Sequence, residues 1–139
     1  MAALRLVSVY KRKDALPLLY RLLLERDHKV NISHRRMPSL AQHKKFVASK
    51  PYKSWKLILA PGGPVGAIYL SRQNEIGLFI LKASQKKGYA KAALALLMKK
   101  NRKERRFLAN VNPQNKRSID FFKNMKFKHI QNTYEWRRV

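Results

Sequence analysis

The spacing of apolar residues in the first third of the chain predicts one strand followed by two helices. Apolar and polar residues alternate over 4–9, as in a short, half-buried strand. After Asp14, which can cap a helix, leucines recur three and four positions apart. Ser39 is a typical N-cap for a second helix over 40–48, whereas residues 31–38 are polar and irregular.

The middle of the chain predicts three strands and a longer helix. Residues 55–60 and 65–70 flank a turn rich in proline and glycine, which is typical of a hairpin. Residues 75–81 form a third strand-like run. A basic loop over 85–88 then leads into a helix rich in alanine and leucine.

The last third predicts a strand over 106–111, a short helix over 115–124 and closing strands over 127–130 and 133–138. No repeat or long linker divides the sequence, so we expect a single domain over residues 1–139. The order of elements indicates the α+β class, with a mixed, mostly antiparallel sheet of about seven strands flanked by about four helices.

Composition excludes several classes of protein. No stretch approaches the roughly 20 apolar residues of a membrane span, and the first residues lack the pattern of a secretory signal. We therefore expect a cytoplasmic protein without a membrane partner. The absence of cysteine excludes disulfides, thiolate metal sites and a cysteine nucleophile. No histidines and carboxylates have the spacing of metal ligands, so the sequence predicts no metal.

The charge is strongly unbalanced, because 32 Lys and Arg face 7 Asp and Glu, for a formal net charge of +25. Such a balance indicates a polyanionic partner, and nucleic acid and small anionic ligands are both candidates. The densest basic run, residues 99–106, lies about 15 Å from the loop at 85–88, at ~1.5 Å per helical residue. It is therefore too distant to share a small ligand with that loop, but it could dock an acidic or nucleic-acid partner.

The loop before the alanine-rich helix has the features of an anion site. A strand, a turn containing Gly88 and a helix start aim several backbone N–H groups at one point, where the helix dipole adds partial positive charge. Gly88 permits close approach, Ala90 keeps the first turn small, and three lysines add charge: Lys86, Lys87 and Lys91. The alternative is a strand-to-helix turn whose glycine only supplies an unusual dihedral angle.

Two motifs resemble the signature of the GNAT superfamily of acyl-CoA N-acyltransferases. Gln85-x-x-Gly88-x-Ala90 resembles the Arg/Gln-x-x-Gly-x-Gly/Ala motif at the start of that family's central helix. Further along, the chain carries a run similar to the family's asparagine, small residue, aromatic and Gly-Phe sequence: Asn115-x-x-Ser118, Phe121-Phe122 and Lys126-Phe127. The order of elements fits as well, so the resemblance covers nearly all of the chain.

The resemblance implies an N-acetyltransferase that uses acetyl-CoA as co-substrate. In the family, the strand before the loop pairs free backbone groups with the pantetheine arm, and the loop holds the pyrophosphate. The implied coenzyme-binding residues are Phe79, Ile80, Leu81, Gln85, Lys86, Lys87, Gly88, Tyr89, Ala90, Asn115, Ser118 and Phe122. From the residues alone, Asn115 can equally be an ordinary helix N-cap, and the paired phenylalanines can equally be core.

Catalysis requires a group that removes a proton from the amine before it attacks the thioester. Of the 7 carboxylates, Glu75 alone opens the strand that would line the acyl channel, and it resembles the glutamate that many relatives use there. An exposed strand-end glutamate is the alternative. Phe122 stands where many relatives carry a tyrosine acid, so the acid would be solvent or Tyr134. Lys126, in place of the usual glycine, is a second departure.

A finer resemblance concerns the acceptor. Residues 32–38 and 66–70 look similar to transferases that acetylate amino sugars on nucleotide carriers, which implies four acceptor-binding residues: His34, Arg36, Met37 and Tyr69. An acceptor of this kind is anionic overall and would suit the positive charge. Peptide or ribosomal-protein N-termini are rival acceptors. A basic RNA- or ribosome-associated binding module on the same fold is the alternative function. We expect a monomer or a homodimer.

Overall fold

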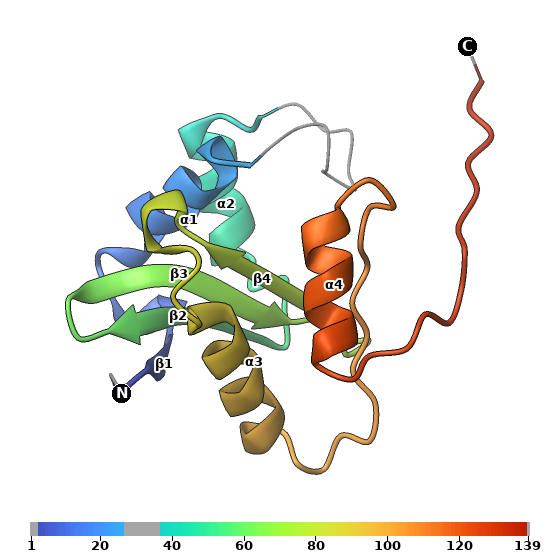
Figure 1. The fold of residues 1–139 in the computed structure, drawn as a ribbon. Coiled ribbons are helices and arrows are strands. Elements are labelled where there is room, and N and C mark those ends of the chain that lie inside the picture. Colours follow the sequence, from blue (N-terminus) through green and yellow to red (C-terminus); the bar gives the residue numbers. More distant parts are fainter. Residues whose placement is uncertain (1–2, 27–36, 139) are drawn as a thin grey trace.

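A four-stranded antiparallel sheet forms the centre of the computed structural model, which describes residues 3–26 and 37–138 (Figure 1). The strands lie side by side in chain order: β1 (Arg5–Ser8), β2 (Ser54–Ala60), β3 (Gly63–Leu70) and β4 (Ile76–Ile80). Each strand pairs with the next in antiparallel register. The four strands predicted before residue 82 are therefore confirmed.

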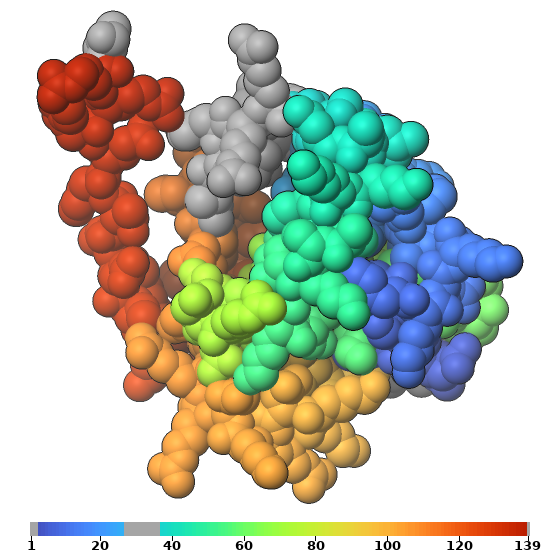
Figure 2. Space-filling view, turned by 180° about the vertical axis from the view of Figure 1, so that it is seen from behind, coloured from blue at the N-terminus to red at the C-terminus, as the bar shows by residue number. Residues whose placement is uncertain are grey.

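Two helices, α1 (Ala15–Leu24) and α2 (Leu40–Ala48), cover one face of the sheet, and Figure 2 shows them from behind as the blue and teal layer. The turn η1 (Val9–Lys11) joins β1 to the start of α1. Beneath the helices lies a buried cluster of Val9, Ala15, Leu19, Leu22, Val47, Trp55, Leu57, Leu59, Ala67 and Leu81. Leucines spaced three apart on α1 belong to it, as the helical pattern predicts.

The caps of these two helices differ from each other. Ser39 accepts the N–H of Gln42 at 3.1 Å, and the Gln42 side chain accepts the N–H of Ser39 at 2.9 Å, so α2 begins with a capping box. Asp14 precedes α1 as predicted, but its side chain makes no cap hydrogen bond. It accepts two 2.8 Å hydrogen bonds from Arg12 instead. A nearby guanidinium thus competes successfully with the helix for the carboxylate.

Helices α3 (Tyr89–Lys100) and α4 (Lys116–Asn124) lie on the opposite face of the sheet (Figure 1). A second buried cluster packs there, made of Leu6, Ile58, Val65, Ile68, Leu70, Ile76, Ala93, Leu94 and Leu97. The predicted α+β class is confirmed, with four α-helices in the described part of the chain. Within those same ranges no helix is long and apolar enough to cross a bilayer.

The strand predicted over 106–111 is wrong, because this segment makes one isolated bridge instead of a ladder. Leu108 pairs in parallel with Glu75. The N–H of Ile76 donates to Leu108 O at 2.8 Å, and the N–H of Leu108 donates to Asn74 O at 2.9 Å. A strand persists only while its hydrogen bonds continue, and here β4 and the segment part after a single pair.

The two closing strands predicted over 127–130 and 133–138 are also wrong, since no strand follows α4 up to residue 138. This C-terminal segment runs away from the body of the molecule (Figure 1). Ile130, Tyr134 and Trp136 are 61%, 88% and 76% exposed. The alternating pattern is typical of strands, but a strand needs a neighbour to pair with. The sheet of the described residues has four strands, not about seven.

Two glycines permit close contacts between β3 and β4. A Cβ atom on Gly66 would collide with the carbonyl oxygen of Phe79, and one on Gly77 would collide with the ring of Tyr69. Gly77 and Tyr69 are register partners, so the missing side chain lets the aromatic ring lie across β4. Gly62, in the β2–β3 turn, has open space at its Cβ position.

Gly66→Ala should therefore destabilise the fold by about 1–3 kcal/mol, because the added methyl group meets backbone of the neighbouring strand. For a domain of this size the melting temperature should fall by roughly 3–10 °C, which circular dichroism would measure. Gly62→Ala is the matched control and should change the melting temperature little. Equal melting temperatures for the two variants would contradict the packing of β3 against β4.

Candidate active site

A cleft of about 670 Å³ runs along β4. Its walls come from the end of α1, from β4, from the loop that follows it and from the first turns of α3 and α4. Among the described residues the lining holds five cations and a single carboxylate, which are Arg26, Lys82, Lys86, Lys91 and Arg117 against Glu25. A concave surface with this excess of positive charge attracts anionic ligands.

The backbone of β4 presents hydrogen-bond donors to this cleft. The N–H of Leu81 donates to Val65 O at 2.9 Å, so the odd-numbered residues of this strand bond to β3. Backbone groups along a strand point alternately to its two sides. The N–H groups of Leu78 and Ile80 therefore point away from β3, and both residues line the cleft. Hydrophobic periodicity could not single out Leu78, because it does not show which side of a strand is paired.

The loop between β4 and α3 turns through two residues in the left-handed region. Lys86 has φ 64° and Gly88 has φ 83°, and Gly88 directly precedes the first turn of α3. The first N–H groups of a helix have no partner within it. There is open space where a Gly88 Cβ would lie. An anion can therefore approach this backbone closely, with the side chains of Lys86 and Lys91 beside it.

Gln85 ties the end of β4 to α4. Its side-chain amide donates to Ile80 O at 3.0 Å, and its side-chain oxygen accepts from Arg117 at 2.8 Å. One amide thus connects two walls of the cleft. Arg117 was missed by sequence reasoning, although its place in the first turn of the helix that Asn115 caps is the signal that could have found it.

Ten of the 12 predicted coenzyme-binding residues line the cleft: Phe79, Ile80, Gln85, Lys86, Gly88, Tyr89, Ala90, Asn115, Ser118 and Phe122. The other two do not. Leu81 is buried in the cluster below α1, and Lys87 is exposed outside the lining. Asn115 also caps α4, since its side chain accepts the N–H of Ser118 at 3.2 Å. The ordinary N-cap role and a place in the cleft therefore coexist.

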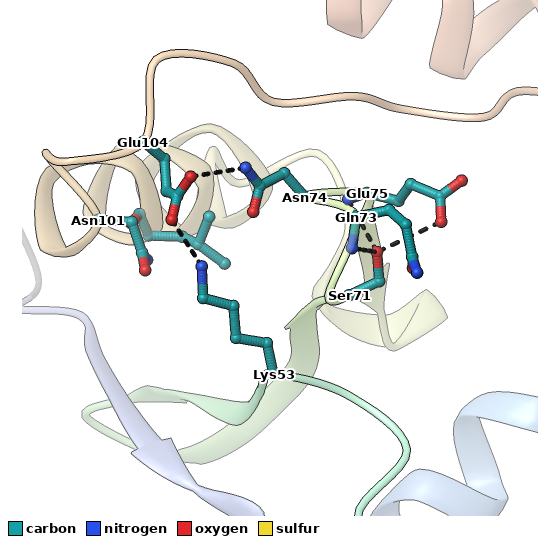
Figure 3. A network of polar contacts seen from close by, with 8 residues as sticks. Lys53, Ser71, Gln73, Asn74, Glu75, Asn101 and Glu104 are labelled. Atoms are coloured by element: carbon teal, nitrogen blue, oxygen red, sulfur yellow. Dashed lines mark hydrogen bonds and ion pairs between the residues drawn. The ribbon is translucent and has the colours of Figure 1, made fainter.

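Glu75 is held firmly at the start of β4 (Figure 3). One carboxylate oxygen accepts from Ser71 Oγ at 3.3 Å, and the other accepts from the Asn110 amide at 2.6 Å. Ser71 Oγ itself accepts the N–H groups of Gln73 and Glu75, so its one proton is directed to the carboxylate. Glu75 does not line the cleft. It lies about 10 Å along the strand from Leu78, at ~3.3 Å per residue.

The opposite side of the same turn is anchored by Glu104 (Figure 3). Its carboxylate accepts from Lys53 at 2.7 Å and from the Asn74 amide at 2.7 Å. These hydrogen bonds, Lys53 first, lower the pKa of Glu104. The turn between β3 and β4 is thus fixed on both sides, which gives Glu75 a defined position.

An aromatic cluster lies on the α1 and α2 face of β4. Tyr69, a predicted acceptor residue, stacks on Tyr52 with ring centres 3.8 Å apart and planes 2° from parallel. Trp55 meets Tyr52 edge-on at 4.8 Å, and Phe79 lies 6.3 Å from Tyr69. Of these rings, only that of Phe79 belongs to a residue that lines the cleft.

A half-buried arginine adjoins the Phe79 ring, and a buried histidine lies on α2. The guanidinium carbon of Arg26 lies 3.9 Å from the centre of the Phe79 ring, and burial lowers the pKa of Arg26. His43, on α2, is 3% exposed, and its ring lies 5.3 Å from that of Tyr20. Burial, and then the charge of Arg26, lower the pKa of His43. Sequence reasoning missed Arg26, because nothing in its spacing separates it from the other basic residues.

The remaining predicted site residues are not gathered here. Met37 is half-buried just before α2 and does not line the cleft. His34 and Arg36 lie outside the described residues. Tyr134, the candidate acid, lies in the exposed C-terminal segment and not in the cleft. In the ranges that the structure describes, no three His, Asp or Glu side chains are grouped as metal ligands.

Comparison with known proteins identifies the family. Residues 4–128 match the family model described as "Acetyltransferase (GNAT) domain". The chain belongs to the GNAT acetyltransferase family, whose members use acetyl-CoA as co-substrate. A comparison with curated proteins found no match.

Solved structures share the fold. A domain from Methanocaldococcus jannaschii superposes with a TM-score of 0.80 at 21% identity, covering 97% of this chain and 94% of that chain. An acetyltransferase from Thermus thermophilus gives 0.74 at 20% identity, with 94% and 90% covered. The aminoglycoside N-acetyltransferase AAC(6')-Iy in complex with CoA gives 0.67 at 16% identity, with 99% and 95% covered.

His43 should make the protein less stable as the pH falls. Because its folded-state pKa is lowered, the unfolded chain binds a proton below about pH 6.5 that the folded state excludes. The free energy of unfolding should then fall, at most by about 1.4 kcal/mol per pH unit. Melting temperatures between about pH 8 and pH 5 would show the slope, and His43→Gln should flatten it.

The control for this measurement is His129→Gln, because His129 is exposed. This variant should keep the pH slope of the wild type. An unchanged slope in His43→Gln would show that His43 is not the group whose protonation opposes folding.

Proposed function

We propose that this chain transfers an acetyl group from acetyl-CoA to a primary amine of a small anionic acceptor. An amino sugar on a nucleotide carrier is the leading class of acceptor. The observation that carries the proposal is the convergence of free β4 N–H groups and a cationic glycine turn in one cleft. Membership of the GNAT family supports it.

The residues of the cleft fit acetyl-CoA. The turn at Gly88, with Lys86 and Arg117, would hold the pyrophosphate. The N–H groups of Leu78 and Ile80 would pair with the pantetheine arm and polarise the thioester carbonyl. When bound, acetyl-CoA supplies an activated acetyl thioester. The volume of the cleft and its excess of cations suit the size and the negative charge of acetyl-CoA.

Glu75 is the proposed base. An alkylammonium group, with a pKa of about 10, must lose a proton before its nitrogen can attack. Glu75 lies further along β4, away from the free N–H groups. It therefore takes this proton through water and not by direct contact. The nitrogen then bonds to the carbonyl carbon and loses a second proton to water, the carbon–sulfur bond breaks, and CoA leaves as a thiolate. With a thiol pKa of about 8.5, the thiolate can be reprotonated by solvent, which fits Phe122 at the place of a tyrosine acid.

Isothermal titration with acetyl-CoA and with a generic RNA, each at two salt concentrations, tests the proposal against the binding-module alternative. We expect saturable acetyl-CoA binding and release of free thiol when an amine is added. RNA binding that fades steeply with salt, without coenzyme binding, would favour the module.

Gly88→Val should weaken acetyl-CoA binding at least about tenfold, because a β-branched side chain at φ 83° strains the turn and blocks the approach to its backbone. Gly63→Val is the matched control. Gly63 has φ 126° and open space at its Cβ position. It is the first residue of β3, beside the hairpin turn and outside the cleft, so the substitution adds strain without touching the site. Full affinity in a folded Gly88→Val protein would refute this placement of the pyrophosphate.

Glu75→Gln should lower the turnover number roughly 100-fold, the usual size of a general-base contribution, with little change in acetyl-CoA affinity. Higher pH should partly restore turnover, because more of the amine is then already neutral. Glu135→Gln, in the C-terminal segment, is the control and should retain full turnover. If Glu75→Gln loses coenzyme affinity at normal turnover, Glu75 is structural.

A further inference from the structure

Arg26 is a half-buried arginine for which the described residues provide no acceptor. It follows α1, lines the cleft and stacks on the ring of Phe79 at 3.9 Å. Its Nε atom is buried and has no hydrogen-bond partner in the described ranges. None of the ion pairs in those ranges includes Arg26 either. A guanidinium stays charged at any ordinary pH, so it cannot relieve this state by losing its proton.

The one carboxylate that the described residues place in the cleft wall is already committed. One Glu25 oxygen accepts the N–H of Lys82 at 2.8 Å, and the other accepts from Arg21 at 3.3 Å. Among the described residues, no ion pair joins Glu25 to the neighbouring Arg26. Removing donors from water without supplying an acceptor is unfavourable. An anionic ligand in the cleft would supply the missing acceptor.

The position of Arg26 separates it from the coenzyme's phosphates. Side chains of a strand alternate between its faces, and the Phe79 ring lies with the cluster below α1 and α2. Tyr89, at the end of the glycine turn, packs on the other face with α3. Arg26 therefore contacts β4 on the face opposite to the one where the Tyr89 ring packs, although both residues line the same cleft. An anion held at Arg26 would then be a group of the second substrate.

We propose that Arg26 binds an anionic group, carboxylate or phosphate, of the acceptor and selects amines that carry one. This inference rests on the proposed acetyltransfer. The guanidinium carbon lies 3.9 Å from the centre of the Phe79 ring, and a guanidinium can donate two parallel hydrogen bonds, which a carboxylate or a phosphate can accept. Lysine cannot reproduce this arrangement, because its ammonium group neither stacks flat nor donates as a fork.

Two matched pairs of amines test the selection: L-alanine against L-alaninamide, and phosphoethanolamine against ethanolamine. Release of CoA thiol would be followed with the wild type, Arg26→Gln, Arg26→Lys and the control Arg102→Gln. Arg102 follows α3, is exposed and does not line the cleft, so its loss removes the same charge elsewhere. Each amine would be compared with its neutral partner within one variant.

We expect the wild type to prefer the anionic member of at least one pair, and the pair that responds identifies carboxylate or phosphate. Arg26→Gln should lose at least about tenfold in kcat/KM for that member and little for its neutral partner. Arg26→Lys should recover only part of the loss. Arg102→Gln should behave as the wild type. The KM for acetyl-CoA should stay constant in all four proteins.

Other outcomes would overturn the inference. Equal losses for anionic and neutral amines, with a lower melting temperature, would make Arg26 a packing residue. A rise in the KM for acetyl-CoA alone would assign it to the coenzyme. If the wild type acetylates none of the four amines, the proposed function fails for these acceptors. Titration of alanine and phosphoethanolamine into the complex with CoA then tests the role of Arg26 separately. The inference requires that at least one of the two compounds binds to the wild type and that Arg26→Gln abolishes this binding.

Discussion

The structure depends on one event in the backbone, the parting of β4 from the segment 106–111 after a single bridge at Leu108. A continued ladder would have used the outward N–H groups of Leu78 and Ile80 for sheet formation. Because the ladder stops, these donors face the cleft, where water or a ligand must satisfy them. The glycine turn and Gln85 then close one end of the opening. The site is thus an open edge of the sheet that carries unpaired N–H donors.

The scarcity of acidic residues shapes the rest. Three half-exposed carboxylates serve as local anchors: Glu25 on the backbone of Lys82, Glu75 on Asn110, and Glu104 between Lys53 and Asn74. Such hydrogen bonds to ionised groups are among the stronger ones in proteins. Once these acids are engaged, the cations around the cleft have few internal partners. The cleft therefore keeps the positive charge of the composition, because the carboxylates already have other hydrogen-bond partners.

Local features of the structure could be predicted from the sequence, whereas pairing could not. The Ser39 cap, the hairpin and the loop at Gly88 are each determined by a few consecutive residues, and all three are present. The segment 133–138 has an alternating pattern without any strand, because pairing depends on a neighbour that the pattern does not encode. For the same reason, sequence patterns did not identify Leu78 or Arg26. The place of Leu78 depends on which side of β4 is unpaired, and that of Arg26 depends on its burial. The GNAT resemblance reached further, since a family motif carries spatial information that periodicity lacks.

The alternation of β4 has a consequence for how such a protein can change over generations. Phe79 points to the face of α1 and α2, while its neighbours Leu78 and Ile80 direct their side chains to the other face. Their contribution to the cleft edge is made by main-chain atoms, which every residue except proline possesses. Mutations at position 79 can therefore reshape the cleft on the α1 and α2 face while leaving the main-chain donors intact. Within one strand of five residues, the side chain of Phe79 can be replaced during evolution. The main-chain donors of the same strand do not depend on side-chain identity.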